Sequence, residues 1–331
     1  MTAPDAGRAA AEPADSGQSG APSAGHAGPR HPLDGASPRR PAGTSAGVLR
    51  IDAPGLLTTV QDLGRGGLAS LGVSRSGALD RGALRTANRL LGNDEGAAAL
   101  EIALGGFAAT ALSDLWVAAA GAWGRLRIAG HDVDPYAAHP WPTGEELTWE
   151  PFTAGLRGYL AVRGGIEVPL SVGSRSADLL GGLGPAPLQA GDVVAVGDAA
   201  GPIPVAEVMP WGPPHDEGIE VALAAGPRAD WFTDEAHRLL FERTWTVSAQ
   251  ADRVGLRLDG PPLPRLVPGE LPSEGMVPGA LQVPPDGRPV VLLADGPVTG
   301  GYPVIAVVAD AALDLFAQVR PGTGIRFRHA R

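Results

Sequence analysis

The sequence predicts a mainly β protein with a few short helices, built as barrels or sandwiches. The chain of 331 residues contains 48 Gly and 33 Pro, which divide it into many short segments. Most of these segments are apolar or alternate between apolar and polar residues, which is typical of strands. Aromatic residues make up 5% of the chain, so aliphatic side chains must fill its interior.

The first 47 residues differ from the rest. They contain 12 Ala, 8 Gly and 7 Pro, and Leu33 is their only large aliphatic residue besides Met1. This composition predicts a disordered tail over 1–47. Neither a secretory signal nor an apolar run of about 18 residues is present, so we expect a cytoplasmic protein without a membrane span.

The first strand is expected at 48–51, ending before Pro54-Gly55. Asp80 is placed to cap a helix that carries Leu84, Ala87 and Leu91 at helical spacing and ends at Gly92. Residues 100–104 alternate as a strand, with Glu101 facing away from the leucines. Glu101 is then either an exposed strand residue or a carboxylate directed into a polar site.

Further elements follow in the same way. An alternating strand near 253–258 would place Arg253 and Arg257 together on its polar face. Asp310 is expected to cap a helix that carries Leu313 and Phe316, and 199–216, rich in proline, is expected to connect two domains. Other strands are expected at 116–120, 125–128, 158–162, 219–223, 290–294 and 304–308, and another helix at 234–243.

A weak internal repeat runs through the chain. Segments 143–149, 190–196 and 321–327 each consist of a glycine turn followed by an alternating strand. They suggest related β units but are too short to establish a duplication.

Charge and composition exclude several functions. The net charge of −10 belongs to 48–331, because the first 47 residues carry four Arg and four acids. This acidic balance disfavours nucleic-acid and anionic-membrane partners. The sequence has no cysteine and no lysine, which excludes thiolate chemistry, a Walker-A lysine and covalently attached biotin.

Three further candidate motifs, for a metal site, a nucleophile elbow and a dinucleotide site, do not fit the sequence. The seven histidines lack metal-ligand spacing, so no metal site is expected. The segment 72–77 does not fit a nucleophile elbow, because its second glycine falls one place late. The glycines at 181–184 are followed by Pro185 and Pro187, which prevent the helix start of a dinucleotide site.

Polar side chains in glycine-rich loops are the best candidates for a site. The segment from Thr58 to Asp80 is the richest of these loops, and 173–176 is a second. Such arginines could bind a small anion or carboxylate, or they could form ordinary ion pairs. The candidate residues are Asp62, Arg65, Arg75, Asp80, Arg163, Arg175, Arg253, Asp295 and Thr299.

An ordered set of motifs resembles a known family. The motifs are TTVQDLGR (58–65), SGALD (76–80), ANRLLGN (87–93), LEI (100–102), AVRGGI (161–166), GSRS (173–176), DRVGLRL (252–258), LQVP (281–284) and TGGYP (299–303). Together they resemble the biotin-dependent carboxyltransferase family, also called the allophanate hydrolase subunit 2 type. The resemblance covers 48–327, and the tail has no counterpart in the family.

The resemblance implies two tandem cyclophilin-like β-barrel subdomains, over 48–205 and 206–331. It is nearest in type to the C subunit of bacterial 5-oxoprolinase, which works with the A and B subunits and uses ATP to hydrolyse 5-oxoproline to L-glutamate. Two other functions stay open. One is the carboxyltransferase subunit of a biotin-dependent urea or amide carboxylase, and the other is a non-catalytic antagonist of a kinase inhibitor.

The same resemblance suggests roles for single residues in the processing of a small amide or lactam. Arg65 or Arg253 would stabilise developing negative charge, and Asp62 or Asp295 would orient or deprotonate the nucleophile. Pro297 and Val298 depart from the family pattern, which usually has a polar residue and a threonine before Thr299. Substrate contacts are expected from Asp80, Glu101, Arg175, Gln282, Thr299, Gly300, Gly301 and Tyr302.

Overall fold

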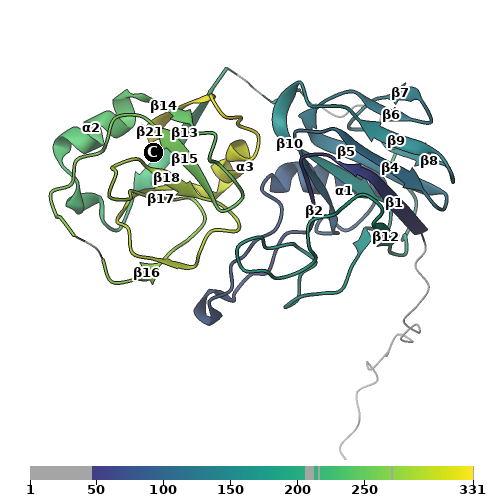
Figure 1. Cartoon of the computed structure of the whole chain (residues 1–331), viewed down its shortest axis with the longest axis horizontal. Coiled ribbons are helices and arrows are strands. Elements are labelled where there is room, and N and C mark those ends of the chain that lie inside the picture. The colour runs from purple at the N-terminus through teal and green to yellow at the C-terminus, as the bar shows by residue number, and fades with distance from the viewer. Residues whose placement is uncertain (1–46, 206–211, 215–216, 270, 331) are drawn as a thin grey trace, which may run out of the picture. The chain divides into compact units, whose positions relative to one another are not determined.

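The computed structural model describes residues 47–205, 212–214, 217–269 and 271–330, which all belong to one compact unit. Strands dominate this part of the chain, and its helices are few and short, as predicted (Figure 1). The expected tail at 1–47 lies outside the described residues except for Gly47, and the connection at 199–216 is described only in part. The boundary between 205 and 206 therefore stays a prediction.

Two facing sheets form the N-terminal half. The larger sheet has seven strands in the order β11-β12-β1-β4-β9-β6-β7, and the smaller has five in the order β2-β3-β10-β5-β8. The larger sheet contains β1 (Gly47–Pro54), β4 (Phe107–Ala111), β6 (Leu126–Ile128), β7 (His131–Val133), β9 (Glu146–Trp149), β11 (Ile166–Glu167) and β12 (Val193–Val196). The smaller contains β2 (Leu57–Gln61), β3 (Ala99–Ala103), β5 (Leu115–Trp123), β8 (His139–Trp141) and β10 (Ala154–Val162).

The core of this half lies between the two sheets. Along β1, Leu49 and Ile51 are buried while Arg50 is exposed, because successive side chains of a strand point to opposite faces. Their buried side chains pack with those of Leu100 and Ile102 from the smaller sheet. The alternation predicted at 100–104 therefore gives the inward face of that strand correctly.

Helix α1 (Arg81–Leu91) covers the outer face of the smaller sheet. Asp80 caps it by accepting a 2.8 Å hydrogen bond from the amide of Ala83, as predicted. Gly92 ends it in the left-handed conformation. Leu84 and Leu91 pack against the alanines and Tyr159 on this side of the sheet.

A closed seven-stranded barrel forms the C-terminal half, in the order β13-β20-β17-β18-β15-β14-β21. The first and last strands, β13 and β21, pair in parallel, and α2 packs beside β21. The barrel strands are β13 (Ile219–Ala225), β14 (Thr244–Val247), β15 (Gly255–Asp259), β17 (Ala280–Gln282), β18 (Val290–Leu292), β20 (Val304–Val308) and β21 (Gly324–His329). The remaining elements of this half are a ribbon of β16 (Glu274–Gly275) and β19 (Thr299–Gly300), helices α2 (Asp234–Glu242) and α3 (Leu313–Phe316), and 3₁₀ turns η2 (Ala229–Trp231) and η3 (Asp310–Ala312).

One helix cap was predicted wrongly. Asp310 lies inside η3, and its side chain caps no helix. Its carboxylate instead accepts two hydrogen bonds from Arg81, at 2.9 and 3.0 Å. A salt bridge to an arginine 229 residues away cannot be read from local spacing. None of the helices in the described ranges is long and apolar enough to cross a membrane.

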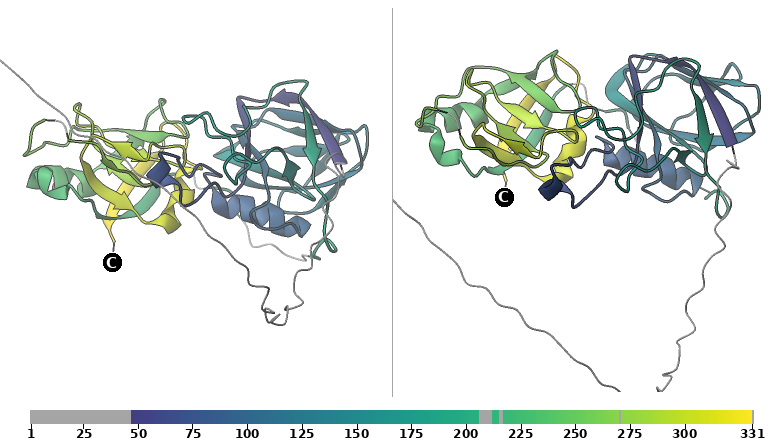
Figure 2. Two further views of the ribbon diagram at one scale, coloured as in Figure 1. Left: turned by 90° about the horizontal axis from the view of Figure 1, so that it is seen from below. Right: turned by 60° about the horizontal axis from the view of Figure 1, so that its bottom comes forward.

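Contacts in both directions join the halves. The views in Figure 2 show the segment after β2, which carries η1 (Ala69–Leu71), leaving the N-terminal half and reaching the barrel. There the amide of Ser76 donates a 2.9 Å hydrogen bond to the carbonyl of Ala294. In the other direction, Arg320 of the barrel half donates to the carbonyls of Gly155 and Phe152, both at 2.7 Å.

Candidate functional site

The glycine-rich segment Thr58–Asp80 crosses itself next to the barrel. The amide of Arg65 donates to the carbonyl of Arg75 at 2.8 Å. A Cβ on Gly64 would lie 2.5 Å from that same oxygen, and a Cβ on Gly77 would lie 2.7 Å from the amide nitrogen of Gly64. Two backbone segments therefore touch where only glycine fits. We call this contact between 62–65 and 75–78 the loop crossing.

Ser76 sits in the crossing with a φ of 51°, which is uncommon for a residue other than glycine. Its hydroxyl lies 2.7 Å from Asp295 Oδ1 and 2.8 Å from the carbonyl of Ala177. Such backbone strain is often found at functional sites, where surrounding contacts hold it in place. Here those contacts come from both halves of the chain.

Asp62 holds the second glycine loop in position. Its carboxylate accepts hydrogen bonds from the amides of Gly64 and Arg175, each at 2.7 Å, and from the hydroxyls of Ser174 and Ser176 at 2.6 and 2.5 Å. Burial raises the pKa of Asp62, but these hydrogen bonds outweigh it, so the net pKa is lower than usual. A carboxylate with four donors and a low pKa is suited to positioning the loops.

Arg65 is 3% exposed. Its guanidinium donates to the carbonyls of Ser176 at 2.5 Å and Ser171 at 3.3 Å. Its third nitrogen, Nη1, has no hydrogen-bond partner among the described residues, and neither has the buried Oε1 of Gln61. Buried unpaired polar atoms are rare, which marks Arg65 as unusual.

An ion cluster lies where the halves meet. Arg253 donates through Nε and Nη2 to the two oxygens of Asp295, each at 2.9 Å. Its Nη1 donates to Glu101 Oε1 at 2.5 Å, and Nη2 also reaches the carbonyl of Gly77 at 2.7 Å. Arg253, Asp295 and Glu101 are exposed by only 2%, 0% and 4%.

Glu101 connects this cluster to the five-stranded sheet. Its Oε2 accepts hydrogen bonds from the hydroxyl of Tyr159 at 2.7 Å and from the amide of Leu79 at 3.1 Å. Arg157 Nε lies 3.5 Å from Oε1. Burial raises the pKa of Glu101, but Arg253 and Arg157 outweigh it and lower the net pKa. Two arginines thus balance two carboxylates inside the ion cluster of Glu101, Arg157, Arg253 and Asp295.

The contacts of the ion cluster test the predictions for Glu101 and for Arg253. Glu101 faces away from the leucines, as predicted, and of its two possible positions it takes the polar site. The predicted shared face of Arg253 and Arg257 is wrong. Strand β15 begins only at Gly255, so Arg253 lies before it and turns inward, whereas Arg257 is exposed on the strand.

Asp80 is placed between α1 and the barrel half. Besides capping α1, its carboxylate accepts a 2.7 Å hydrogen bond from Gln318 Nε2. Burial raises the pKa of Asp80 to about 6, assisted by repulsion from Asp314 and Glu101 and opposed by the two hydrogen bonds. The protonation of Asp80 therefore changes closer to neutral pH than that of an ordinary aspartate.

The side chains of the other predicted residues make their contacts outside the ion cluster. Arg175 forms a 2.5 Å ion pair with Glu167, and Arg163 donates to backbone carbonyls. Residues 299–302 pack against 271–276: β19 pairs with β16, and the carbonyl of Gly301 accepts from the amide of Leu271. A Cβ on Gly300 would lie 3.6 Å from Gln282 Oε1, so these two predicted residues are neighbours.

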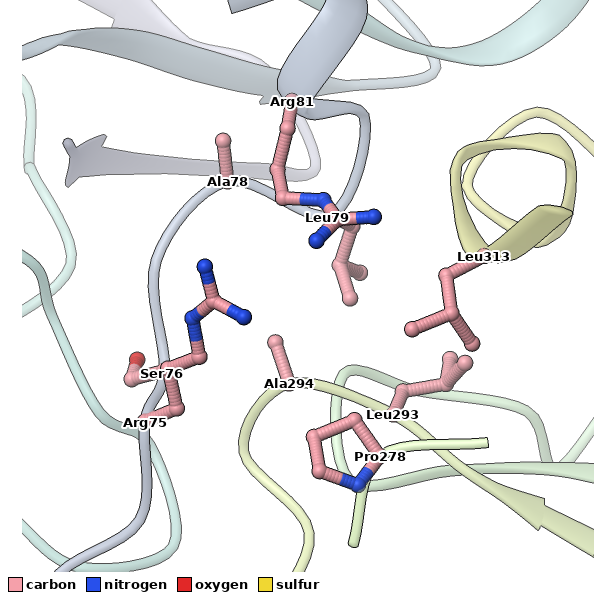
Figure 3. A pocket seen from close by; sticks show the side chains of 9 residues that line it. All are labelled: Arg75, Ser76, Ala78, Leu79, Arg81, Pro278, Leu293, Ala294 and Leu313. Carbon is pink, nitrogen blue, oxygen red and sulfur yellow. The ribbon is translucent and has the colours of Figure 1, made fainter. Parts of the chain in front are cut away.

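A hollow opens beside the loop crossing (Figure 3). It encloses about 380 Å³ including solvent at its mouth, and both halves contribute to its walls. We call it the Arg75 hollow, after the arginine that reaches into it. It is lined by Arg75, Ser76, Ala78, Leu79, Arg81, Pro278, Leu293, Ala294 and Leu313.

The Arg75 hollow differs from the ion cluster and Asp62 in being open to a ligand. The ion cluster and Asp62 are saturated by protein groups, so they position the segments around them. The hollow instead has apolar walls and the guanidinium group of Arg75, which can receive a small anion. Arg75 was only a member of the wider sequence set, and it is missing from the residues to which the resemblance gave roles. Its position between Ser74, Ser76 and Gly77 was the available signal.

Within the described ranges, no cluster of three or more His, Cys, Asp or Glu side chains could hold a metal ion. The two helices longer than two turns begin with acids, Asp80 at α1 and Asp234 and Glu235 at α2. Negative charge at a helix N-terminus repels phosphate.

Comparison with known proteins gives consistent matches. The sequence model of the carboxyltransferase domain, subdomain A and B, matches residues 71–329. The C subunit of 5-oxoprolinase from Escherichia coli (strain K12) is 39% identical over 287 residues, which cover 85% of this chain and 90% of that protein.

Two solved structures share the fold. The crystal structure of TTHA0988 has a TM-score of 0.79 and 42% sequence identity, and the match covers 87% of this chain and 56% of that one. The K. lactis urea amidolyase has a TM-score of 0.81 and 28% identity, and the match covers 87% of this chain and 19% of that one. The chain therefore spans only part of the length of both proteins.

Proposed function

Because the chain belongs to the family of the carboxyltransferase domain, subdomains A and B, we propose that it is the C subunit of an ATP-dependent 5-oxoprolinase. In this proposal it acts with the A and B subunits to hydrolyse 5-oxo-L-proline to L-glutamate. We expect the complex in the cytoplasm, where ATP is available.

One observation carries the proposal. The match to the C subunit of the Escherichia coli 5-oxoprolinase extends over 90% of that protein. The match to the K. lactis urea amidolyase extends over 19% of a much longer chain, at lower identity. A separate subunit of a multi-protein enzyme is therefore the better description.

The chain's contribution in this proposal is to hold the small lactam. The Arg75 hollow is small, partly apolar and built by both halves, which suits a compact cyclic acid. ATP is assigned to another subunit, since the described helix N-termini carry acids in place of a phosphate site. Attack by water on the lactam carbon would follow its activation elsewhere in the complex.

The roles first suggested for single residues are refined accordingly. Asp62, Asp295 and Arg253 become positioning residues, because their polar atoms are taken up by neighbours. Arg65 stays a candidate donor for developing negative charge, because its Nη1 is unpaired among the described residues. Gln282 and residues 299–302 stay predicted contacts, for a substrate or for a partner subunit.

Reconstitution tests the proposal. The chain is mixed with its cognate A and B subunits, and ADP and glutamate are measured with and without 5-oxo-L-proline. We expect ADP release that depends on 5-oxoproline, glutamate formed in equal amount, and loss of both when the chain is left out. Arg89→Ala is a suitable reference variant, because Arg89 is exposed on α1 and pairs only with Glu95 among the described residues.

A second set of assays separates the alternatives. The chain is combined with a biotin carboxylase and a biotinylated carrier, and urea-dependent consumption of bicarbonate is measured. Activity in this assay with none on 5-oxoproline would favour the carboxyltransferase alternative. No activity in either assay would favour a regulatory binding protein.

A further inference from the structure

The guanidinium of Arg75 makes no hydrogen bond within the part of the chain that the structure describes. Its side chain reaches into the hollow (Figure 3). The other arginine of the hollow differs. Arg81 uses all three nitrogens, donating to Asp314 at 3.0 Å and to the carboxylate and carbonyl of Asp310 at 2.7–3.0 Å.

The backbone around Arg75 is rigidly held. Its carbonyl accepts from the amide of Arg65 at 2.8 Å. Ser74, on one side, donates its hydroxyl to Asp178, and Ser76, on the other, lies against Asp295 with a φ of 51°. The backbone on both sides of Arg75 is thus held in place, whereas its side chain is exposed and makes no hydrogen bond within the described ranges.

The walls restrict the kind of ligand. Leu79 and Leu293 are 6% and 3% exposed, and Pro278, Ala294 and Leu313 complete an apolar surface opposite the guanidinium groups. Asp310 and Asp314 already neutralise Arg81, and Asp310 also feels the charge of Arg75. One available cation favours a singly charged anion over a polyphosphate.

We propose that the Arg75 hollow is a carboxylate subsite, in which Arg75 binds the carboxylate of a small acid and the apolar walls hold its ring. Resting on the proposed function, this assigns the carboxylate of 5-oxo-L-proline to Arg75 and the ring methylenes to Leu79, Leu293 and Leu313. The subsite would let the complex distinguish 5-oxoproline from lactams that have no carboxylate.

The first test compares two substrates in the reconstituted complex. The probes are 5-oxo-L-proline and 2-pyrrolidone, which has the same lactam ring without the carboxylate. For Arg75→Gln we expect KM for 5-oxoproline to rise about 10- to 100-fold, the range for a lost charged hydrogen bond. Turnover of 2-pyrrolidone should stay within about twofold of wild type. Arg89→Ala should leave both substrates unchanged.

Two outcomes of this comparison would contradict the carboxylate subsite. An unchanged KM for 5-oxoproline in Arg75→Gln overturns the subsite, and so does an equal loss on both substrates. Folding is not in doubt, because the Arg75 side chain is exposed and makes no hydrogen bond in the described structure.

Failure of the proposed function is recognised separately, since the wild-type complex would then show no activity that depends on 5-oxoproline. In that case the full-length chain is titrated with 5-oxo-L-proline and acetate while its thermal unfolding is followed. Stabilisation of the wild type that is absent in Arg75→Gln supports the carboxylate subsite. Equal shifts in both proteins, or none in either, reject it.

Discussion

Arg253 is the residue on which the junction between the halves depends most. Replacing it with methionine would leave Glu101 and Asp295 buried without their shared cation. Breaking a buried ion pair in this way costs about 3–5 kcal/mol. We expect Arg253→Met to lower the free energy of unfolding by that amount, measured by urea denaturation at pH 7.

Arg257→Met is the matched control, because Arg257 is four residues further on and exposed. It should change the free energy of unfolding by less than about 0.5 kcal/mol. Adding Glu101→Gln to Arg253→Met should restore part of the loss, since it removes one uncompensated charge. Equal effects of Arg253→Met and Arg257→Met would show that the ion cluster does not stabilise the fold.

Asp80 gives a prediction about pH. Its pKa in the folded protein is about 6, above the usual 3.8, so the folded state binds this proton more tightly than the unfolded state. The stability from this group is therefore complete below pH 3.8 and is lost as pH rises to about 6. The loss amounts to at most about 3 kcal/mol, at 1.36 kcal/mol for each pKa unit.

Asp80→Asn removes this titration but can still cap α1. It also loses the acceptor for Gln318, which costs stability at every pH. We expect the stability of Asp80→Asn relative to wild type to increase between pH 4.5 and pH 7, measured by urea unfolding at both values. A difference between the two proteins that is independent of pH would show that the pKa of Asp80 is not raised.

Local sequence predicted some residues well and others not at all. Asp80 was identified as a cap because capping acts within three residues. The burial of Arg253 could not be predicted, since its partner Glu101 lies 152 residues away. The same reason explains Asp310, and also Arg75, because local sequence does not tell which of several loop arginines finds an acid.

Among the elements, the loop crossing restricts the sequence most, because only glycine fits at Gly64 and Gly77. Gly64 and Gly67 have nearly equal φ angles, 81° and 80°. A Cβ on Gly64 would lie 2.5 Å from a backbone oxygen, whereas a Cβ on Gly67 would meet nothing within 4 Å among the described residues. Comparing alanine substitutions at Gly64 and Gly67 therefore distinguishes the cost of a steric clash from the cost of a strained backbone.

We expect Gly67→Ala to cost about 1 kcal/mol, the strain of a left-handed alanine. Gly64→Ala should cost clearly more and should weaken 5-oxoproline turnover, because the crossing must open and displace Arg75. Thermal unfolding and the reconstituted assay measure both effects. Equal losses of stability and turnover in the two variants would mean that the loop crossing accommodates the added Cβ without affecting the fold or Arg75.

Strands were the elements that sequence predicted most reliably. The three glycine-turn repeats at 143–149, 190–196 and 321–327 became β9, β12 and β21. Alternation identifies a strand and its buried face, but not its neighbours. The repeats consequently lie in different sheets, two in the seven-stranded sheet and one in the barrel.

At the scale of the molecule, the halves are expected to unfold together. The ion cluster, Gln318 and Arg320 all connect them. Buried tryptophans report on each half, Trp149 in the first and Trp245 in the barrel. We expect one urea transition when fluorescence and circular dichroism are compared in the wild type.

The double variant Arg253→Met/Arg320→Ala should unfold in two urea transitions, one for each half. It removes the contacts of Arg253 with Glu101 and of Arg320 with Gly155 and Phe152, which connect the halves. Arg257→Met/Arg326→Ala is the control, since both arginines are exposed on barrel strands. Two transitions in the wild type itself would mean that the halves are independent.

The parallel pairing of β13 with β21 determines when the barrel can form during synthesis. Strand β13 (Ile219–Ala225) is synthesised about a hundred residues before its neighbour β21 (Gly324–His329). The N-terminal half, whose last strand ends at Val196, can close its sheets well before that. Until β21 has been synthesised, the edges of β13 and β14 that face it have no partner strand, and unpaired edges favour aggregation. The exposure of β13 therefore lasts until a strand about a hundred codons further along has been translated.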